Sequence, residues 1–303
     1  MSSPSVSALS AVEIGVPDLD AAARFYEEVW GLSVVERSGT TCYLRAAGPD
    51  HYVLALHRRD VPDLVRVKLG APDRAAVDGL FKRVGEAGGK PLSAPAAVDA
   101  PGGGYGFAFR DLEGREFHVS SDVRRHPEST PPNDRPCRLS HVVFNSLDFD
   151  RAAAFLRDAL GFRLRDRTRK ANFMGCNADH HCIAFTDRKN SALSHVAYEL
   201  PSLDAVLRGC GRLKRAGLPI EWGVGRHGTG DNVFAYFVDP NNFAIEYTAE
   251  MQQVDDATYA PGTAETATRP SHSDVWGLAE PPSQRFLQAL DGPSRQGASA
   301  GAQ

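Results

Sequence analysis

The chain has 303 residues, of which 42% are hydrophobic and 24% are charged, and its formal net charge is −4 at pH 7. These values are typical of a soluble globular protein long enough for two domains. The absence of a long basic run argues against nucleic acid as a partner. No run of about 18 apolar residues occurs and the start of the chain does not resemble a signal peptide, so no membrane association is predicted. The five cysteines have no CxxC spacing and predict reduced thiols in a cytoplasmic protein.

The first part of the chain predicts a domain over residues 9–123, after a flexible Ser-rich start at 1–8. A strand at 12–16 leads to a helix at 18–30, with Asp18 as its N-cap and Gly31 at its end. Further strands, a second helix and closing strands follow. The strands are expected at 40–46, 51–59 and 64–70, the helix at 73–88, and the closing strands at 105–111 and 115–121.

The second part repeats this scheme about 130 residues later, a period of domain size. LSHVVFNSLDFDRAAAFLRDALGFRL, from Leu139, matches LSAVEIGVPDLDAAARFYEEVWGLSV, from Leu9. A Pro-rich, charged linker at 124–138 separates the copies. The second domain is predicted at 139–250. The tail at 251–303 is a candidate lid over the site, and its last residues are expected to be disordered.

Aligning the copies isolates a set of residues that only the second one has. His141, His195 and Glu246 in the second copy correspond to Ala11, Arg66 and His118 in the first. Because the first copy tolerates Ala and Arg at two of these places, packing does not require the histidines. Two imidazoles and one carboxylate leave coordination positions open, as in non-heme Fe(II) sites that bind both a substrate and O₂. The triad therefore predicts a metal site.

Five motifs give the chain a family resemblance over roughly residues 9–250: LSHVVF, HHCIAF, LSHVAYE, GRHGTGDNVFAY and DPNNFAIEYTAE. They resemble the type I extradiol ring-cleavage dioxygenases of the vicinal oxygen chelate superfamily, of the catechol 2,3-dioxygenase and 2,3-dihydroxybiphenyl 1,2-dioxygenase kind. The resemblance implies an α+β fold of paired βαβββ modules. It also implies Fe(II) (alternatively Mn(II)) as cofactor, O₂ as cosubstrate, a catechol as substrate, a muconic semialdehyde-type product and a homo-oligomer. Asn242 and Ala235 depart from the family pattern, but neither is a proposed ligand.

The same resemblance assigns three further residues. His181 matches the family's catalytic histidine beside the substrate, whereas its neighbour His180 has a counterpart, His51, in the first copy and is interpreted as structural. His227 matches a second pocket histidine, and Tyr236 matches a pocket tyrosine near the metal. Histidine suits proton transfer because its ordinary pKa lies near neutrality.

Substrate contacts are predicted less directly. Phe173 and Trp222 are expected to approach the pocket and to favour an uncharged ring, and the tail is expected to contribute His272 and Trp276. Two other functions stay open for this fold. One is a metal-dependent glyoxalase-like isomerase or lyase, whose sites usually use more carboxylates or ligands from both copies. The other is a non-catalytic protein that binds a small molecule.

Overall fold

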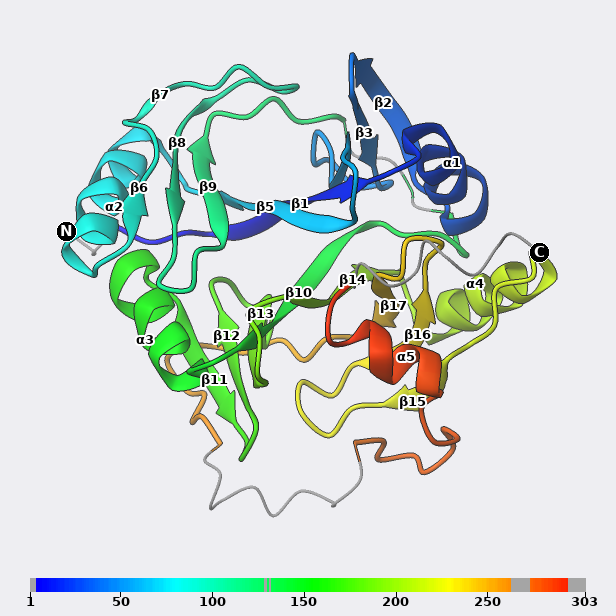
Figure 1. Ribbon diagram of the computed structural model, residues 1–303. Helices are drawn as coiled ribbons and strands as arrows, with labels where there is room; N and C mark the ends of the chain where they lie inside the picture. Colours follow the sequence, from blue (N-terminus) through cyan, green and yellow to red (C-terminus); the bar gives the residue numbers. More distant parts are fainter. Residues whose placement is uncertain (1–3, 128–129, 131, 263–272, 294–303) are drawn as a thin grey trace.

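The computed structural model describes residues 4–127, 130, 132–262 and 273–293, which form two sheet-based halves (Figure 1). The N-terminal half contains a mixed sheet with strand order β2-β3-β4-β1-β5-β9-β8-β6, and β7 pairs with β8. Its strands are β1 (Ala8–Val16), β2 (Ser33–Ser38), β3 (Thr41–Arg45), β4 (Leu54–Arg58), β5 (Asp63–Gly70), β6 (Lys90–Pro91), β7 (Ala96–Ala97), β8 (Tyr105–Arg110) and β9 (Glu116–Ser121), and its helices are α1 (Leu19–Arg24), the π-helix η1 (Phe25–Trp30) and α2 (Arg74–Glu86).

The C-terminal half repeats this topology, with strand order β11-β12-β13-β10-β14-β17-β16-β15. Its elements are β10 (Arg138–Ser146), α3 (Phe149–Leu160), β11 (Arg163–Arg167), β12 (Ala171–Gly175), β13 (Ile183–Asp187), β14 (Leu193–Glu199), α4 (Leu203–Arg215), β15 (Trp222–Arg226), β16 (Val233–Val238), β17 (Ala244–Ala249) and α5 (Gln284–Ala289). Each half is thus two βαβββ units joined side by side through their first strands, which confirms the predicted fold class.

The helices begin where local side chains satisfy free backbone N–H groups. Asp18, Asp73, Asp148 and Ser202 each accept a hydrogen bond from the backbone N–H three residues later. The helix predicted at 18–30 is α-helical only in its first part, α1. Its second part is the π-helix η1, which has a wider turn. This widened turn buries Phe25, Tyr26 and Trp30 together.

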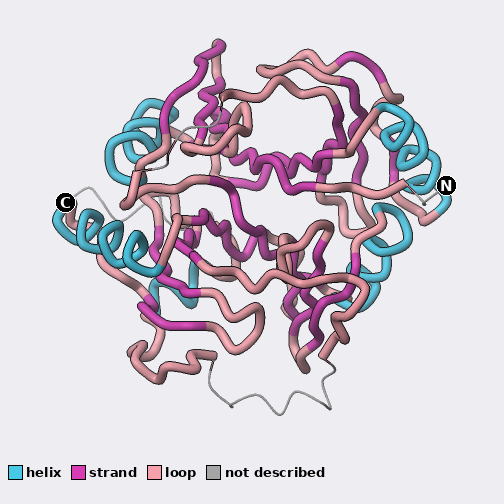
Figure 2. The backbone as a smooth tube through the Cα atoms, turned by 180° about the vertical axis from the view of Figure 1, so that it is seen from behind, coloured by secondary structure: helices cyan, strands magenta, loops and turns pink. Residues whose placement is uncertain are grey.

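The two halves pack helix on helix at both ends of their common boundary. α2 lies against α3, and η1 lies against α4, on opposite sides of the molecule in both views (Figures 1 and 2). Buried hydrophobic side chains from both halves form one continuous core. None of the described helices is long and apolar enough to cross a membrane.

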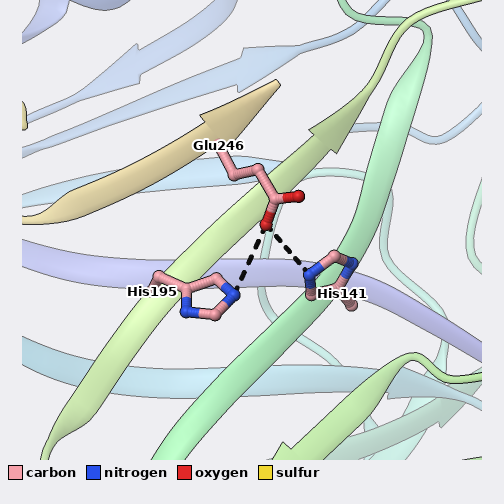
Figure 3. A group of neighbouring side chains, drawn as sticks. All are labelled: His141, His195 and Glu246. Atoms are coloured by element: carbon pink, nitrogen blue, oxygen red, sulfur yellow. Dashed lines mark ion pairs between the residues drawn. The ribbon is translucent and has the colours of Figure 1, made fainter. Parts of the chain in front are cut away.

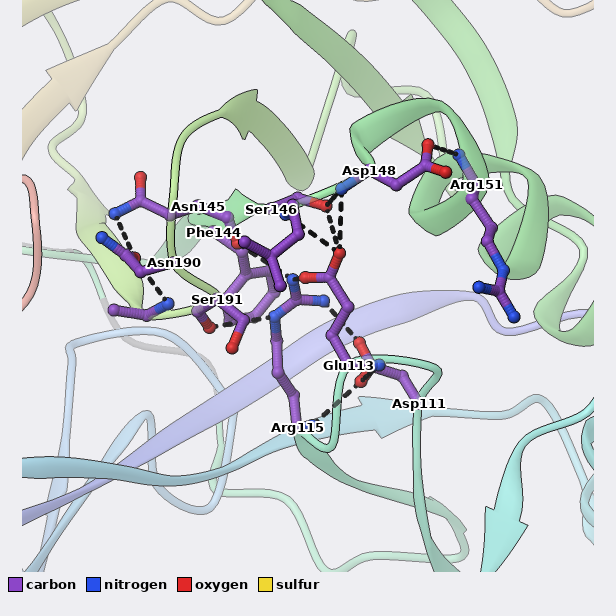
Figure 4. Close-up of polar contacts among 12 residues, drawn as sticks. Asp111, Glu113, Arg115, Phe144, Asn145, Ser146, Asp148, Arg151, Asn190 and Ser191 are labelled. Atoms are coloured by element: carbon purple, nitrogen blue, oxygen red, sulfur yellow. Dashed lines mark hydrogen bonds and ion pairs between the residues drawn. The ribbon is translucent and has the colours of Figure 1, made fainter.

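The turn between β8 and β9 anchors the N-terminal half to the C-terminal half (Figure 4). The Arg115 side chain, 3% exposed, donates to the Asn145 carbonyl over 2.9 Å and lies over the Phe144 ring at 5.1 Å. Its charge is matched by Asp111, whose carboxylate it contacts at 2.5 Å, and by Glu113. Glu113 in turn accepts the Ser146 hydroxyl over 2.7 Å. This charged cluster couples one β-turn of the first half to the end of β10.

Candidate metal centre

Three neighbouring strands in the middle of the C-terminal sheet, β10, β14 and β17, carry the predicted triad. The register places His141 opposite Ala197, and Ala197 opposite Glu246, in one row across the strands. His195 lies two residues before Ala197, and therefore on the same face of the sheet. Since Ala197 has only a methyl group, the three larger side chains converge above it.

The converging atoms lie close enough for a shared ion (Figure 3). Glu246 Oε2 lies 3.2 Å from His141 Nε2 and 3.4 Å from His195 Nε2. One ligand atom from each of the three residues lies within 4.8 Å of the others. Within the described parts of the chain, this is the one group of His, Cys, Asp and Glu side chains with such a geometry.

The buried polar atoms of the cluster fit a metal ion. Both ring nitrogens of His195 and Oε2 of Glu246 are buried and have no hydrogen-bond partner among the described residues. Leaving such groups unpaired is costly, and a divalent cation would satisfy them. His141 Nδ1 lies 3.2 Å from the Ser140 hydroxyl, so the opposite nitrogen is the one that faces the cluster.

Burial also sets the protonation states that a metal requires. Desolvation lowers the pKa of His141 and of His195 to about 3, so both imidazoles are neutral at pH 7. Burial raises the pKa of Glu246, against the opposing effect of His195. Neutral imidazoles with a carboxylate form the donor set of a non-heme Fe(II) or Mn(II) site.

Asn232 supports the carboxylate and was not identified from the sequence. It is fully buried, and its Nδ2 lies 3.5 Å from Glu246 Oε1 and donates to the Thr248 hydroxyl over 2.8 Å. This contact orients Glu246 so that Oε2 faces the two histidines. The only sequence signal was its place in the GRHGTGDNVFAY motif.

His181 lies directly beside the triad. Its ring centroid is 4.7 Å from that of His141 and 5.1 Å from that of Phe173, so the structure brings both predicted residues to the cluster. His181 Nδ1 lies 3.1 Å from His180 Nδ1, and His180 Nε2 lies 3.2 Å from Asp166. Burial lowers the pKa of His181 well below its ordinary value, so the free protein holds it as a neutral ring.

His227 and Tyr236 occupy another side of the cluster. The Tyr236 hydroxyl lies 3.0 Å from His227 Nε2, and the Tyr236 ring packs against His195 with centroids 5.3 Å apart. His227 Nδ1 lies 3.0 Å from the Ser273 carbonyl, which can only accept, so Nδ1 carries a hydrogen. Nε2 of the neutral ring is then an acceptor, and the Tyr236 hydroxyl donates to it. Ser273, in the described part of the tail, thereby fixes the tautomer of a predicted pocket residue.

The remaining predicted contacts fall in different places. Trp222 stacks on Tyr236, with ring centroids 5.2 Å apart, and also contacts Phe286 of α5. The side chain of Trp276 is 36% exposed. The Arg226 guanidinium lies over the Trp276 ring, 5.0 Å from the ring centroid. His272 is outside the described residues. The tail therefore meets this region through Ser273 and Phe286, neither of which the sequence singled out.

Comparison with known proteins is consistent with this architecture. Residues 138–247 match the Glyoxalase/Bleomycin resistance protein/Dioxygenase superfamily, and residues 11–120 match a Glyoxalase-like domain. The chain therefore belongs to the vicinal oxygen chelate superfamily, with one such module in each half.

Two of the curated relatives are a metapyrocatechase and a dihydroxybiphenyl dioxygenase. Metapyrocatechase 2 of Cupriavidus necator is 34% identical over 39% of this chain, and the match spans only 38% of that protein. The manganese-dependent 2,3-dihydroxybiphenyl 1,2-dioxygenase of Geobacillus genomosp. 3 is 26% identical over 75% of this chain and 79% of its own length.

Among solved structures, the Mn(II)-bound glyoxalase from Novosphingobium aromaticivorans is 37% identical. It covers 93% of this chain and 94% of its own, with a TM-score of 0.87. The relatives thus include both classes of enzyme that the sequence left open.

Proposed function

We propose that the protein is an extradiol dioxygenase that opens a catechol ring beside its two hydroxyl groups, using O₂ and Fe(II) held by His141, His195 and Glu246. The observation that carries this proposal is the composition of the cluster: two neutral imidazoles and one carboxylate with unpaired atoms turned toward one another. Such a set leaves open positions for both a bidentate catechol and O₂. The curated relatives named metapyrocatechase and dihydroxybiphenyl dioxygenase support the same reaction class.

The ion, when bound, would polarise the catechol oxygens, lower their pKa and bring the ring and O₂ together. The His227–Tyr236 pair would hold the substrate on one side, since the Tyr236 hydroxyl donates to His227 and a catechol oxygen can join the same pair. Trp222 and Phe173 would supply aromatic surface for an uncharged ring.

His181 would act on the side of His141. Its Nδ1 faces His180, which leaves Nε2 as the nitrogen available to a ligand. Because burial keeps the ring neutral in the free protein, His181 would first donate a hydrogen bond. It would act as an acid only after an anionic substrate has raised its pKa.

A glyoxalase-like isomerase is the second candidate, because the 37% identical structure is that of a Mn(II)-bound glyoxalase. The donor set favours the dioxygenase. Among the described residues the cluster contains a single carboxylate, and the corresponding row of the N-terminal half holds Ala11, Lys68 and His118.

The experiment compares both reactions on one preparation. Protein loaded anaerobically with Fe(II) or with Mn(II) is assayed for O₂ uptake and a yellow product with catechol, 3-methylcatechol and 2,3-dihydroxybiphenyl. The same samples receive the hemithioacetal of methylglyoxal and glutathione. Matched uptake and colour, lost in Glu246→Ala and kept in the exposed control Glu250→Ala, support ring cleavage. Isomerisation without O₂ uptake would contradict the proposed ring cleavage and support the glyoxalase-like reaction.

Two broader expectations also remain proposals. The chain is expected to form a homo-oligomer and to act in the cytoplasm on a small aromatic substrate. Light scattering after gel filtration tests the first, and cell fractionation tests the second.

A further inference from the structure

The N-terminal half carries a buried lysine at the place where the C-terminal half has space for a metal. Lys68 on β5 lies opposite Ala11 on β1 and opposite His118 on β9. This row matches the row of His141, Ala197 and Glu246, so Lys68 is the counterpart of Ala197. The lysine is only 4% exposed. A positive charge therefore occupies the centre of both sheets, as an ammonium group in one half and as the proposed metal ion in the other.

The ammonium group of Lys68 has spare hydrogen-bonding capacity. It donates to the Tyr52 hydroxyl over 2.9 Å, and that hydroxyl donates to Glu13 over 2.9 Å. Glu13 is already contacted by His57 Nε2 at 2.7 Å and by Arg66 at 3.6 Å. Within the described ranges, no carboxylate lies within ion-pair distance of the ammonium itself. An ammonium group has three N–H donors. Because Lys68 is buried and the Tyr52 hydroxyl accepts only one of its hydrogen bonds, the other two donors can bind an anion.

Lys68 lines two cavities in the N-terminal half. One, of about 280 Å³, is also lined by the acidic side chains of Glu13 and Asp99, which disfavour an anion. The other, of about 330 Å³, is also lined by Tyr52, His51 and Ser121. We call this second space the His51 cavity.

The His51 cavity presents unused donors. His51 is 4% exposed, and both of its ring nitrogens are buried without a hydrogen-bond partner among the described residues; the same is true of the Ser121 hydroxyl. Burial lowers the pKa of His51, so it offers one N–H and one acceptor nitrogen. Unpaired buried polar atoms lining a cavity are costly in a folded protein unless a ligand or water uses them. Together with Lys68 they form a set of donors that suits a carboxylate.

Two acidic residues also line the His51 cavity, and both face arginines. Asp122 is paired with Arg74 at 2.6 Å, and Asp50 lies 3.9 Å from Arg125. These carboxylates oppose a ligand with several negative charges, such as a phosphate ester, more strongly than a monoanion. The volume lies at the lower end of the range of about 300–1,000 Å³ that is usual for small-molecule pockets, which suits a small ligand.

We infer that the N-terminal half binds a small organic monocarboxylate in the His51 cavity, with the carboxylate on Lys68 and His51. This site is separate from the metal centre and does not rest on the proposed dioxygenase activity. Its test uses benzoate as the probe and benzamide as the uncharged analogue of equal shape. Binding to the full-length, metal-stripped protein is followed by isothermal titration calorimetry and by the change in melting temperature.

The matched variants are Lys68→Met, which keeps an unbranched apolar stem and removes the charged end of the side chain, and Lys82→Met, an exposed control on α2. We expect saturable binding of benzoate, no binding of benzamide, a loss of affinity of at least tenfold in Lys68→Met, and no change in Lys82→Met. The fold should stay intact, because His57 and Arg66 still face the buried carboxylate of Glu13 in this variant. Should Lys68→Met melt at a much lower temperature, His51→Phe takes its place with the same expected loss.

The inference is overturned by any of three results. Benzoate shows no saturable binding, benzamide binds as well as benzoate, or the affinity of both Lys68→Met and His51→Phe stays within threefold of the wild type. Repeating the titration with Glu246→Ala separates this site from the metal centre, because binding in the His51 cavity must be unchanged in that variant.

Discussion

Lys68 and Ala197 occupy the same register position in the two sheets, Lys68 between Ala11 and His118 and Ala197 between His141 and Glu246. The motif LVRVKL places Lys68 two residues after Arg66, as LSHVAY places Ala197 two residues after His195. In the N-terminal half a long cationic side chain stands at this position and lines two cavities. In the C-terminal half a methyl group leaves that space to His141 and Glu246.

The first prediction transfers this difference to the C-terminal half. Ala197→Lys would place an ammonium group between His141 and Glu246, where it pairs with the carboxylate and repels a divalent ion. A unit charge about 4 Å away is worth about 4 kcal/mol at an effective dielectric constant of 20, so the affinity for Fe(II) should fall at least roughly 100-fold. Metal content after loading and desalting measures the effect. The exposed control Ala216→Lys should load fully, and full loading of Ala197→Lys would show that Ala197 does not line the site.

The second prediction concerns His181. His181→Phe keeps a flat ring against His141 and Phe173 and removes both nitrogens. Because general acid catalysis typically contributes about 10²–10⁴-fold, we expect kcat for catechol cleavage to fall by about that factor, with metal content and catechol affinity nearly unchanged. Stopped-flow absorbance under O₂ and anaerobic catechol titration separate the two quantities. Wild-type turnover in this variant would remove His181 from the reaction.

The internal repeat and the pattern of buried apolar residues were enough to predict the strands that carry the metal site. The spacing of apolar residues located β10, β14 and β17, and their central place in the sheet brings His141, His195 and Glu246 together. Domain limits at 123 and 139, and the roles of the site residues, stay predictions.

The sequence did not predict features that depend on long-range contacts or on exposed edges. Most of edge strand β2 is exposed, so it lacks the alternating pattern that identifies a half-buried strand. The π-helix is held by contacts such as that of Tyr26 with Asp239, which are 213 residues apart in the chain. Asn232 and Ser273 reach the site through tertiary structure, and apart from the place of Asn232 in the GRHGTGDNVFAY motif the sequence carries no signal for their contacts.

The third prediction tests the contact between the halves in Figure 4. Arg115→Met leaves Asp111 and Glu113 without their cation in a buried setting and removes the bond to the Asn145 carbonyl. Breaking a buried ion pair from one side typically costs about 3–5 kcal/mol, and urea unfolding should show a loss of that size. The exposed Arg110→Met on the adjoining strand should change stability by less than about 0.5 kcal/mol. Equal stability of the two variants would mean that the halves are held together without this cluster.

The fourth prediction concerns the reciprocal contact, in which the fully buried Asp239 accepts the Tyr26 hydroxyl over 2.9 Å. Burial raises the pKa of Asp239 to about 6, although hydrogen bonds from Phe243, Tyr26 and Asn241 act in the opposite direction. In the unfolded chain the carboxyl group has its ordinary pKa near 4. Between these values the folded state holds a proton that the unfolded state has lost.

The sign of the pH dependence follows from that difference. The protonated carboxyl group favours the folded state fully below about pH 4, and this contribution is lost as the pH rises through 6. Asp239→Asn cannot titrate, so the free energy of unfolding of the wild type minus that of the variant should fall by roughly 2 kcal/mol between pH 4.5 and 7.5. Urea unfolding at four pH values in this range measures it, with the exposed Asp60→Asn as control. A difference that stays constant with pH would mean that the carboxyl group titrates alike in both states, and that the three hydrogen bonds offset the cost of burying its charge.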